Sequence, residues 1–401
     1  MNENLQKKCL CCSSFKIKKI LKLTDSPLTD SYSKSKETSL KKTLYPLELF
    51  YCEECTHLQL GFQVSPTESY KDYLYNSKIT PGLVNSFKEY AEILISRNSK
   101  KEELNILDIG SNDGTFLEAC KNVGCKAIGV EPAEVVAKYA NKHGRKTINA
   151  YLDKNLSNLL KQEEICAKFD YITFNNVLAN IGNPIEALEI AKTMLKSKES
   201  EIVVQTGYHP LQFSKGLFDY IYHEHFSYFN INSMKRLCMQ VGLKVAHYKI
   251  SNLRGGTIRF FLQKGYENEN KINNNLERFS KAVELKGLEI LIDSSRSHLK
   301  SNLDNLKNKK YKIIGFGASH STGVLVKHFG LEKYLDYLVD ENIDKHGLYM
   351  PGTSLQVKDC GVIYKEKNLI ILILAWQYFD LIREKLISNG FEGQILKPML
   401  P

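Results

Sequence analysis

The feature that most restricts the fold is a short apolar stretch, Leu104–Ile109, that leads directly into a glycine-containing turn at residues 110–114. A helical pattern, Thr115–Asn122, follows the turn, and a second apolar stretch, Lys126–Val130, ends at Glu131. A strand, a glycine turn, a helix and a second strand form the basic unit of parallel sheets that bind nucleotide-like ligands. The chain is therefore predicted to have an α/β fold with a Rossmann-like core.

The same alternation of strand and helix continues through the middle of the chain and returns near its end. We expect a core domain over 69–268 that closes with two antiparallel strands, Lys244–Ile250 and Thr257–Gln263. A charge-rich helical stretch then leads into a strand that ends at Gly315 and Gly317, which predicts a smaller Rossmann-like αβ domain over 269–401. Five of the ten cysteines lie in residues 1–68, where periodic helix is scarce, so we expect a separate module there.

Composition limits the classes of partner. The chain has 401 residues, of which 43% are hydrophobic, and a formal charge of +10. No dense lysine and arginine block interleaved with aromatic residues occurs, which argues against nucleic acid. The chain also has no signal-like apolar segment at its start and no apolar run of about 18 residues, the length that spans a membrane. We expect a cytoplasmic protein without membrane contact, present as a monomer or small homo-oligomer.

The cysteines of the first module fall into two pairs with metal-binding spacing. Cys9 and Cys12 form one CxxC pair, Cys52 and Cys55 form the second, and 39 residues separate the pairs. Two thiolates on each of two tight turns complete a tetrahedral zinc site, and four protein ligands leave no open position for catalysis. We therefore predict structural zinc, with Cys11 as an alternative to Cys12.

The glycine turn carries chemistry that narrows its ligand. Glu131 lies 23 residues after Asp108, where a carboxylate at the end of the next strand binds ribose hydroxyls. Gly110 and Gly114 allow a tight turn and close approach of a ligand, and this geometry suits either a dinucleotide or S-adenosylmethionine. Asn112 replaces the middle glycine of a dinucleotide motif, and the acidic Asp108 suits a cationic sulfonium ligand better than a pyrophosphate. These two details favour S-adenosylmethionine.

A histidine-rich and aromatic segment, Phe218–Phe229, follows the strand-like stretch Ile202–Gln205. It supplies the groups that proton abstraction requires: an imidazole base, a carboxylate that orients it and a phenol that stabilises a developing oxyanion. Metal ligation by the His-Glu-His string is a weaker interpretation because the HExxH spacing is absent. A buried aromatic loop without chemistry is the third interpretation.

Together these motifs resemble the sugar C-methyltransferase family of deoxysugar biosynthesis, and the resemblance extends along nearly the whole chain. The shared motifs are Tyr51-Cys-Glu-Glu-Cys-Thr-His-Leu-Gln-Leu60, the Asp108–Gly114 loop, Asn175-Asn-Val-Leu-Ala179, Tyr222-His-Glu-His-Phe-Ser-Tyr-Phe229, Gly255-Gly-Thr-Ile-Arg259, Gly317-Ala-Ser319 and Tyr349-Met-Pro-Gly-Thr353. The resemblance implies an enzyme that methylates a ring carbon next to a ketone on a nucleotide-linked 4-keto-6-deoxyhexose. It also implies that the C-terminal domain helps to hold the nucleotide.

The resemblance further implies roles for single residues. His225 is the expected base, with Tyr222 and Glu224 positioning the substrate or its enolate. Tyr75 matches a tyrosine that approaches the methyl donor, and Asn175 belongs to the donor site. The expected substrate contacts are Asn180, His223 and Arg254.

Two positions depart from the family pattern and leave the acceptor open. Asn180 and Arg254 stand where the family usually has histidine, and Arg254 is interpreted either as a contact to an anionic group or as a surface arginine. Methylation of an oxygen, or of another phosphorylated metabolite, is therefore an alternative. A zinc-containing RNA-binding or RNA-modifying protein, and an NAD-dependent sugar enzyme using Gly315 and Gly317, are alternatives from other classes.

Overall fold

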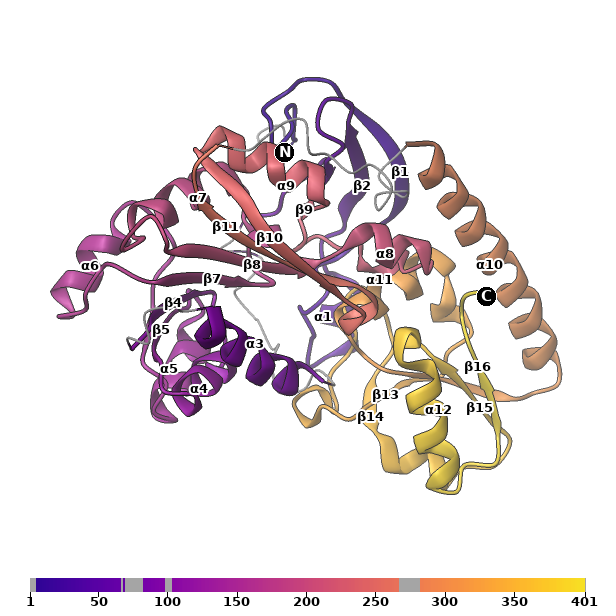
Figure 1. Ribbon diagram of the computed structural model, residues 1–401. Coiled ribbons are helices and arrows are strands. Elements are labelled where there is room, and N and C mark those ends of the chain that lie inside the picture. Colours follow the sequence, from indigo (N-terminus) through magenta and orange to yellow (C-terminus); the bar gives the residue numbers. More distant parts are fainter. Residues whose placement is uncertain (1–4, 66–67, 69–81, 98–102, 267–281, 401) are drawn as a thin grey trace.

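The computed structural model describes residues 5–65, 68, 82–97, 103–266 and 282–400, and these form three sheets with their helices (Figure 1). Tyr75, expected near the methyl donor, lies outside the described residues. Among the helices that are described, none combines the length and apolar character needed to cross a bilayer.

The N-terminal sheet has four strands in the order β1-β2-β3-β9 and is antiparallel throughout. Its strands are β1 (Ile17–Ser26), β2 (Tyr45–Cys52), β3 (Leu58–Leu60) and β9 (Ser227–Tyr228), and α1 (Lys36–Leu40) lies between β1 and β2. The fourth strand, β9, comes from the histidine-rich segment, which lies far along the chain from its partner strand β3. This pairing ties the cysteine-bearing module to the candidate catalytic segment.

The middle sheet has seven strands in the order β10-β11-β8-β7-β4-β5-β6. Strands β4 to β8 pair in parallel, and β11 runs antiparallel to both of its neighbours, β8 and β10. The strands are β4 (Asn105–Ile109), β5 (Lys126–Val130), β6 (Thr147–Ile148), β7 (Tyr171–Asn175), β8 (Glu201–Gly207), β10 (Leu243–Ser251) and β11 (Thr257–Lys264). The predicted parallel sheet and its antiparallel finish are thus confirmed.

Helices cover both faces of this sheet, as expected for strands whose two faces are both apolar. Adjacent residues of β4 point to opposite faces: Ile106 packs with Tyr90 and Phe116, whereas Leu107 packs with Leu188 and Leu237. The helices are α3 (Leu83–Arg97), α4 (Thr115–Asn122), α5 (Glu134–Lys142), α6 (Leu156–Gln162), α7 (Pro184–Thr193), α8 (His209–Ser214) and α9 (Ile231–Gln240).

The C-terminal sheet is parallel, with five strands in the order β14-β13-β12-β15-β16. Its elements are α10 (Ala282–Asn308), β12 (Lys312–Phe316), α11 (His320–Phe329), β13 (Leu338–Asp340), β14 (Val357–Asp359), β15 (Leu369–Ile373), α12 (Phe379–Ser388) and β16 (Gln394–Leu396). The long helix α10 runs along the outer side of the molecule (Figure 1). Its buried Leu288 and Leu299 share one core with Leu21 and Leu23 of β1 and with Ile313 of β12. The N-terminal and C-terminal sheets are therefore packed together.

Candidate active site and cysteine centre

The glycine turn after β4 needs glycine for steric reasons. Gly110 has φ of 68°, and a Cβ there would lie 2.4 Å from Cγ2 of Val177. Gly114 has φ of 73° at the start of α4, and a Cβ there would lie 2.7 Å from Cδ of Arg145. Any larger residue would therefore be strained at both positions and would push the turn away from its neighbours.

Two buried carboxylates flank this turn. Asp108 Oδ1 accepts hydrogen bonds from Thr173 Oγ1 at 2.6 Å and Asn175 Nδ2 at 2.9 Å. Burial raises the pKa of Asp108 to about 7 despite these donors. Glu131 accepts hydrogen bonds from the backbone amides of Asn112 and Ala133, at 3.0 Å and 2.9 Å, and burial raises its pKa as well. Both acids are thus held rigidly at the carboxyl edge of the sheet.

A cavity of about 240 Å³ opens at this edge and gathers most of the site residues predicted from the sequence. Those that line it are Asp108, Gly110, Asn112, Glu131, Asn175, Asn180, Tyr222, Glu224, His225 and Arg254. Gly114 does not line it and acts through the turn instead. The residues assigned to the methyl donor and to the acceptor therefore meet in one cavity.

The polar lining fits S-adenosylmethionine. The side-chain oxygens of Asn175 and Asn180 are buried and have no hydrogen-bond partner among the described residues. Buried polar atoms normally have partners, so these two acceptors indicate a ligand with N–H or O–H donors. The carboxylate of Asp108 matches a cationic group, and that of Glu131 matches ribose hydroxyls.

His225 lies in this cavity as a neutral imidazole. Its ring stacks on the ring of Tyr222, with centroids 4.9 Å apart and planes within 7°, and meets Tyr228 edge to face at 5.5 Å. Burial, followed by the positive charge of Arg254, lowers the pKa of His225 to about 3. The imidazole is therefore uncharged at neutral pH and has a nitrogen lone pair for a proton, but this low pKa makes it a weak base unless a negative charge, such as that of an enolate, develops beside it.

The two neighbours of His225 in the His-Glu-His string differ in their placement. Glu224 lines the cavity, and its Oε1 accepts hydrogen bonds from the backbone N and from Oγ1 of Thr29, each at 3.1 Å. Burial raises the pKa of Glu224 to about 7. His223 is fully buried away from the cavity, where its Nε2 lies 3.2 Å from the carbonyl oxygen of Tyr45. The structure therefore does not bring His223 to the expected substrate position, and its contacts are those of a packing residue.

Arg254 lines this cavity from a constrained loop. It has φ of 51°, in the left-handed region that non-glycine residues rarely adopt. The loop is fixed on both sides: a Cβ on Gly255 would lie 2.2 Å from Leu217, and Lys215 Nζ donates a hydrogen bond to the Gly255 carbonyl at 2.9 Å. A left-handed arginine held by its surroundings is typical of a functional position.

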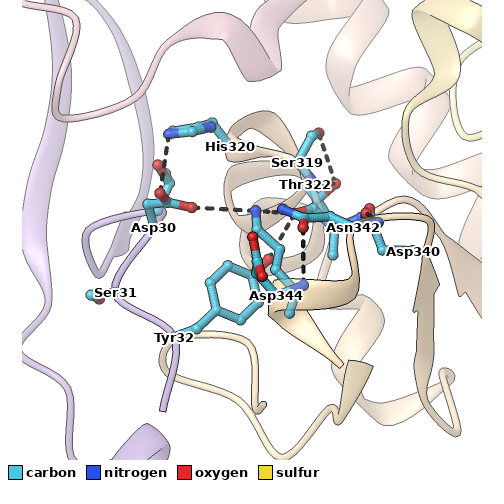
Figure 2. Close-up of polar contacts among 12 residues, drawn as sticks. Asp30, Ser31, Tyr32, Ser319, His320, Thr322, Asp340, Asn342 and Asp344 are labelled. Atoms are coloured by element: carbon cyan, nitrogen blue, oxygen red, sulfur yellow. Dashed lines mark hydrogen bonds and ion pairs between the residues drawn. The ribbon is translucent and has the colours of Figure 1, made fainter. Parts of the chain in front are cut away.

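A second cavity, of about 420 Å³, lies at the carboxyl edge of the C-terminal sheet. Tyr220, Tyr222, Arg254 and His320 line both cavities, so the two adjoin. Figure 2 shows the polar contacts beside it, around the start of α11 and the end of β13. There Asp340 Oδ2 accepts a hydrogen bond from the backbone N of Ala318 at 2.6 Å.

Sequence reasoning did not single out His320, Tyr220 or Lys345 of this second cavity. A signal existed for His320, because it follows Gly317-Ala-Ser319 at the start of a helix, in the same relation to β12 that the first glycine turn has to β4. For Lys345, in the short helical turn Ile343–Lys345, we find no signal in the sequence.

The four paired cysteines of the N-terminal module lie together as predicted. The Sγ atoms of Cys9 and Cys55 are 3.5 Å apart, those of Cys12 and Cys52 are 3.6 Å apart, and all four lie within 4.8 Å of one another. Thiolates around zinc at about 2.3 Å require sulfur separations of about 3.8 Å, so this set fits the ion. Cys11 is buried outside the set, which places Cys12 rather than Cys11 among the ligands.

The fold and the cavity define a Rossmann-like S-adenosylmethionine-dependent methyltransferase. A family model described as "Methyltransferase domain" matches residues 85–248, which contain the glycine turn, both buried carboxylates and His225.

The flanking regions identify the kind of methyltransferase. A model described as "C-methyltransferase C-terminal domain" matches residues 252–398, and one described as "Putative zinc binding domain" matches residues 9–70. The C-methyltransferase NovU of Streptomyces niveus is 22% identical over 403 residues, which cover 98% of this chain and 95% of that protein. The chain is therefore an S-adenosylmethionine-dependent C-methyltransferase, in which a zinc-binding, a methyltransferase and a C-methyltransferase C-terminal domain model match in succession.

Other matches cover less of the chain. The ubiquinone biosynthesis O-methyltransferase of Actinobacillus pleuropneumoniae serotype 5b is 28% identical over 97 residues, 23% of this chain and 41% of that enzyme. Among solved structures, the magnesium protoporphyrin IX methyltransferase of Synechocystis PCC 6803 with bound SAM is 10% identical, with a TM-score of 0.35, and the match covers 51% of this chain and 86% of that one. The plantazolicin methyltransferase BpumL in complex with SAH is 18% identical, with a TM-score of 0.33, over 45% of this chain and 82% of that one.

Proposed function

We propose that this C-methyltransferase acts on a nucleotide-linked 4-keto-6-deoxy sugar and methylates a ring carbon next to the ketone. The observation that carries the proposal is the neutral, buried imidazole of His225. It lines the same cavity as the glycine turn after β4, where the methyl donor is expected, and its ring stacks on the Tyr222 ring. A carbon next to a ketone becomes nucleophilic only after it loses a proton, and this site offers a base where the methyl group is expected.

The chemistry assigned to the side chains follows from their placement. His225 accepts the α-proton, and the electron pair of the broken C–H bond moves into the enolate. The cation of Arg254 and the phenol of Tyr222 line the same cavity and stabilise the enolate oxygen as its negative charge develops. When bound, S-adenosylmethionine would supply the electrophilic methyl group to the enolate carbon and leave as S-adenosylhomocysteine, and Asp108, Glu131 and Asn175 would hold this cofactor.

The second cavity suits the nucleotide part of the acceptor. It meets the first cavity at Tyr222, Arg254 and His320. A single long acceptor would therefore extend from the glycine turn after β4 to the C-terminal sheet. Lys345 and Lys385 line it beside the N-terminus of the ten-residue helix α11, together with the acids Asp340 and Glu341. Lys345 pairs with Asp30 and Lys385 with Glu341, so a phosphate would compete with these carboxylates for the two cations. Cations and a helix N-terminus are the groups that bind phosphate oxygens. We also propose that the protein acts in the cytoplasm, where nucleotide-activated substrates are made.

The test is mass spectrometry of the purified enzyme with S-adenosylmethionine and a panel of nucleotide-linked sugars. The panel pairs each 4-keto-6-deoxy sugar with its 4-hydroxy counterpart, which has no acidic α-hydrogen. We expect one methyl group to be added on a ring carbon of a keto sugar, and no addition to the matched hydroxy sugar.

Two results would contradict the proposal. Methylation of the hydroxy sugars would indicate O-methylation. Binding of the donor without methylation of any sugar would mean that the acceptor belongs to another class, and the search would turn to anionic ketones that suit Arg254.

A further inference from the structure

Residues 28–32, which we call the bridging segment, link the N-terminal module to both cavities. The segment follows β1, and Leu28, Thr29, Asp30 and Tyr32 are at least nine-tenths buried. In Figure 2 it passes beside the start of α11, with Asp30 facing His320. A segment of a zinc module therefore contributes buried polar side chains next to the candidate active site.

Thr29 holds the cavity residue Glu224. Both its backbone N–H and its hydroxyl donate to Oε1 of Glu224, at 3.1 Å each, although 195 residues separate the two in sequence. Two donors on one carboxylate oxygen fix the rotation of the carboxylate and favour its ionised form.

Asp30 pairs with one cation of the second cavity, Lys345, and faces a second residue, His320, at a longer distance. Its Oδ2 lies 3.9 Å from Nε2 of His320, and its Oδ1 lies 3.3 Å from Nζ of Lys345. Lys345 Nζ also donates to the carbonyl oxygen of Ala318 at 2.9 Å, as does the hydroxyl of Tyr32, at 2.9 Å. These contacts connect the N-terminal module to Ala318, in the turn that precedes α11.

We propose that the N-terminal module is part of the acceptor site, with Thr29 and Asp30 as positioning residues that act through Glu224, His320 and Lys345. Neither residue lines either of the two cavities described above, and each contacts side chains that do. The identity of the acceptor rests on the proposed function, whereas the contacts of Thr29 and Asp30 are independent of it.

Thr29 and Asp30 shift the pKa of Glu224 in opposite directions. The polar and titratable side chains that contact it, act on its charge or share its cavity include Thr29, Asp30, Asp108, Glu131, Tyr151, Tyr220, Tyr222, His225, Tyr228, Arg254 and His320. Burial raises the pKa of Glu224 to about 7, the Thr29 donors lower it, and the negative charge of Asp30 raises it. Loss of the Thr29 hydroxyl therefore raises the pKa of Glu224, and loss of the Asp30 charge lowers it.

The experiment compares Thr29→Val with Thr29→Ser, and Asp30→Asn with Asp25→Asn. Serine keeps the hydroxyl, and Asp25 is an exposed acid on β1 of the same module. For each variant, kcat and KM for the accepted sugar are measured between pH 5.5 and 8.5, and the affinity for S-adenosylhomocysteine is measured by calorimetry.

If Glu224 must be ionised, activity falls as pH decreases through its pKa. We expect Thr29→Val to move the acidic side of the pH–activity profile to higher pH. It should also lower kcat/KM about tenfold, which corresponds to the loss of one hydrogen bond to a charged group. Asp30→Asn should move the acidic side of the pH–activity profile to lower pH and raise KM for the acceptor about tenfold, because Lys345 loses its ion pair. Thr29→Ser, Asp25→Asn and all affinities for S-adenosylhomocysteine should match the wild type.

Superimposable pH profiles in all variants, or a lower KM in Asp30→Asn, would overturn the proposal. The second result would mean that Asp30 only repels an anionic acceptor. Failure of the proposed function is seen separately, as a wild type that methylates no sugar. In that case the Glu224 titration, followed by NMR of 13C-labelled glutamate and assigned with Glu224→Gln, decides the positioning role: opposite pKa shifts in Thr29→Val and Asp30→Asn support it, and unchanged pKa values refute it.

Discussion

At the scale of single residues, the candidate site consists of ionisable groups whose burial moves their pKa toward or away from neutrality. Burial raises the pKa of Asp108 and of Glu224 to about 7 and lowers that of His225 to about 3. Strongly shifted pKa values of buried ionisable groups are more frequent at functional sites than elsewhere in a protein. The sequence predicted these three residues through motifs. It did not indicate Thr29 or Asp30, because they belong to no pattern and their partners lie about 200 to 300 residues away.

The raised pKa of Asp108 predicts that donor binding depends on pH. When the pH falls from 8 to 6, Asp108 becomes protonated and can no longer attract a cation, because its pKa lies near 7. We expect the affinity for S-adenosylmethionine to fall about tenfold over this range. Calorimetric titrations at both pH values test this prediction. Asp108→Asn should bind weakly and equally at both, and a variant that keeps the pH dependence would assign it to another group.

At the scale of elements, the sequence predicted most of the middle sheet because its longer strands and helices have clear patterns; the two-residue strand β6 and the short helices α6 and α8 were not predicted. The helix Thr115–Asn122 and the strand Lys126–Val130 have the predicted bounds. The strands of the N-terminal module were not predicted, because a register shift between Lys19 and Leu21 interrupts the alternation of β1. Strand β9 has two residues and pairs with β3, which no local pattern reveals.

The cysteine cluster gives a prediction about the N-terminal sheet, since Cys52 ends β2 and its thiol is one of four in the set. Cys52→Ser should lose bound zinc and destabilise the module, because metal binding and folding of such sites are coupled. Cys11→Ser is the matched control, a buried cysteine beside the set but outside it, and it should keep one zinc per chain. Metal analysis of both purified variants checks this. Zinc lost from Cys11→Ser and kept in Cys52→Ser would reverse the ligand assignment.

At the scale of the whole molecule, the three parts share contacts that the sequence could not show. The family resemblance predicted their order along the chain, but not that β1, α10 and β12 share one core or that two cavities adjoin. One such contact joins the catalytic segment to the C-terminal part: Trp376 Nε1 donates a hydrogen bond to Oδ2 of Asp219 at 3.1 Å. Asp219 is fully buried.

Loss of the hydrogen bond between Trp376 and Asp219 should lower the stability of the whole protein. Trp376→Phe keeps an aromatic ring but leaves Asp219 without this donor, so the free energy of unfolding should fall by about 1–3 kcal/mol. Urea unfolding followed by circular dichroism measures the change. Asp219→Asn combined with Trp376→Phe should cost less than the sum of the two single variants, because both remove the same interaction. Full additivity would mean that the two residues act independently.

The central claim is that His225 removes an α-hydrogen from a keto sugar in the cavity that also holds the methyl donor. The most direct test is exchange of that hydrogen in deuterated water, followed by proton NMR with S-adenosylhomocysteine present so that no methyl transfer occurs. We predict exchange at one ring position with the wild type, and none with His225→Ala, while both bind S-adenosylhomocysteine equally. Exchange at the wild-type rate in His225→Ala would contradict the assignment of the base, and a wild type that methylates the sugar without any exchange would contradict the enolate mechanism.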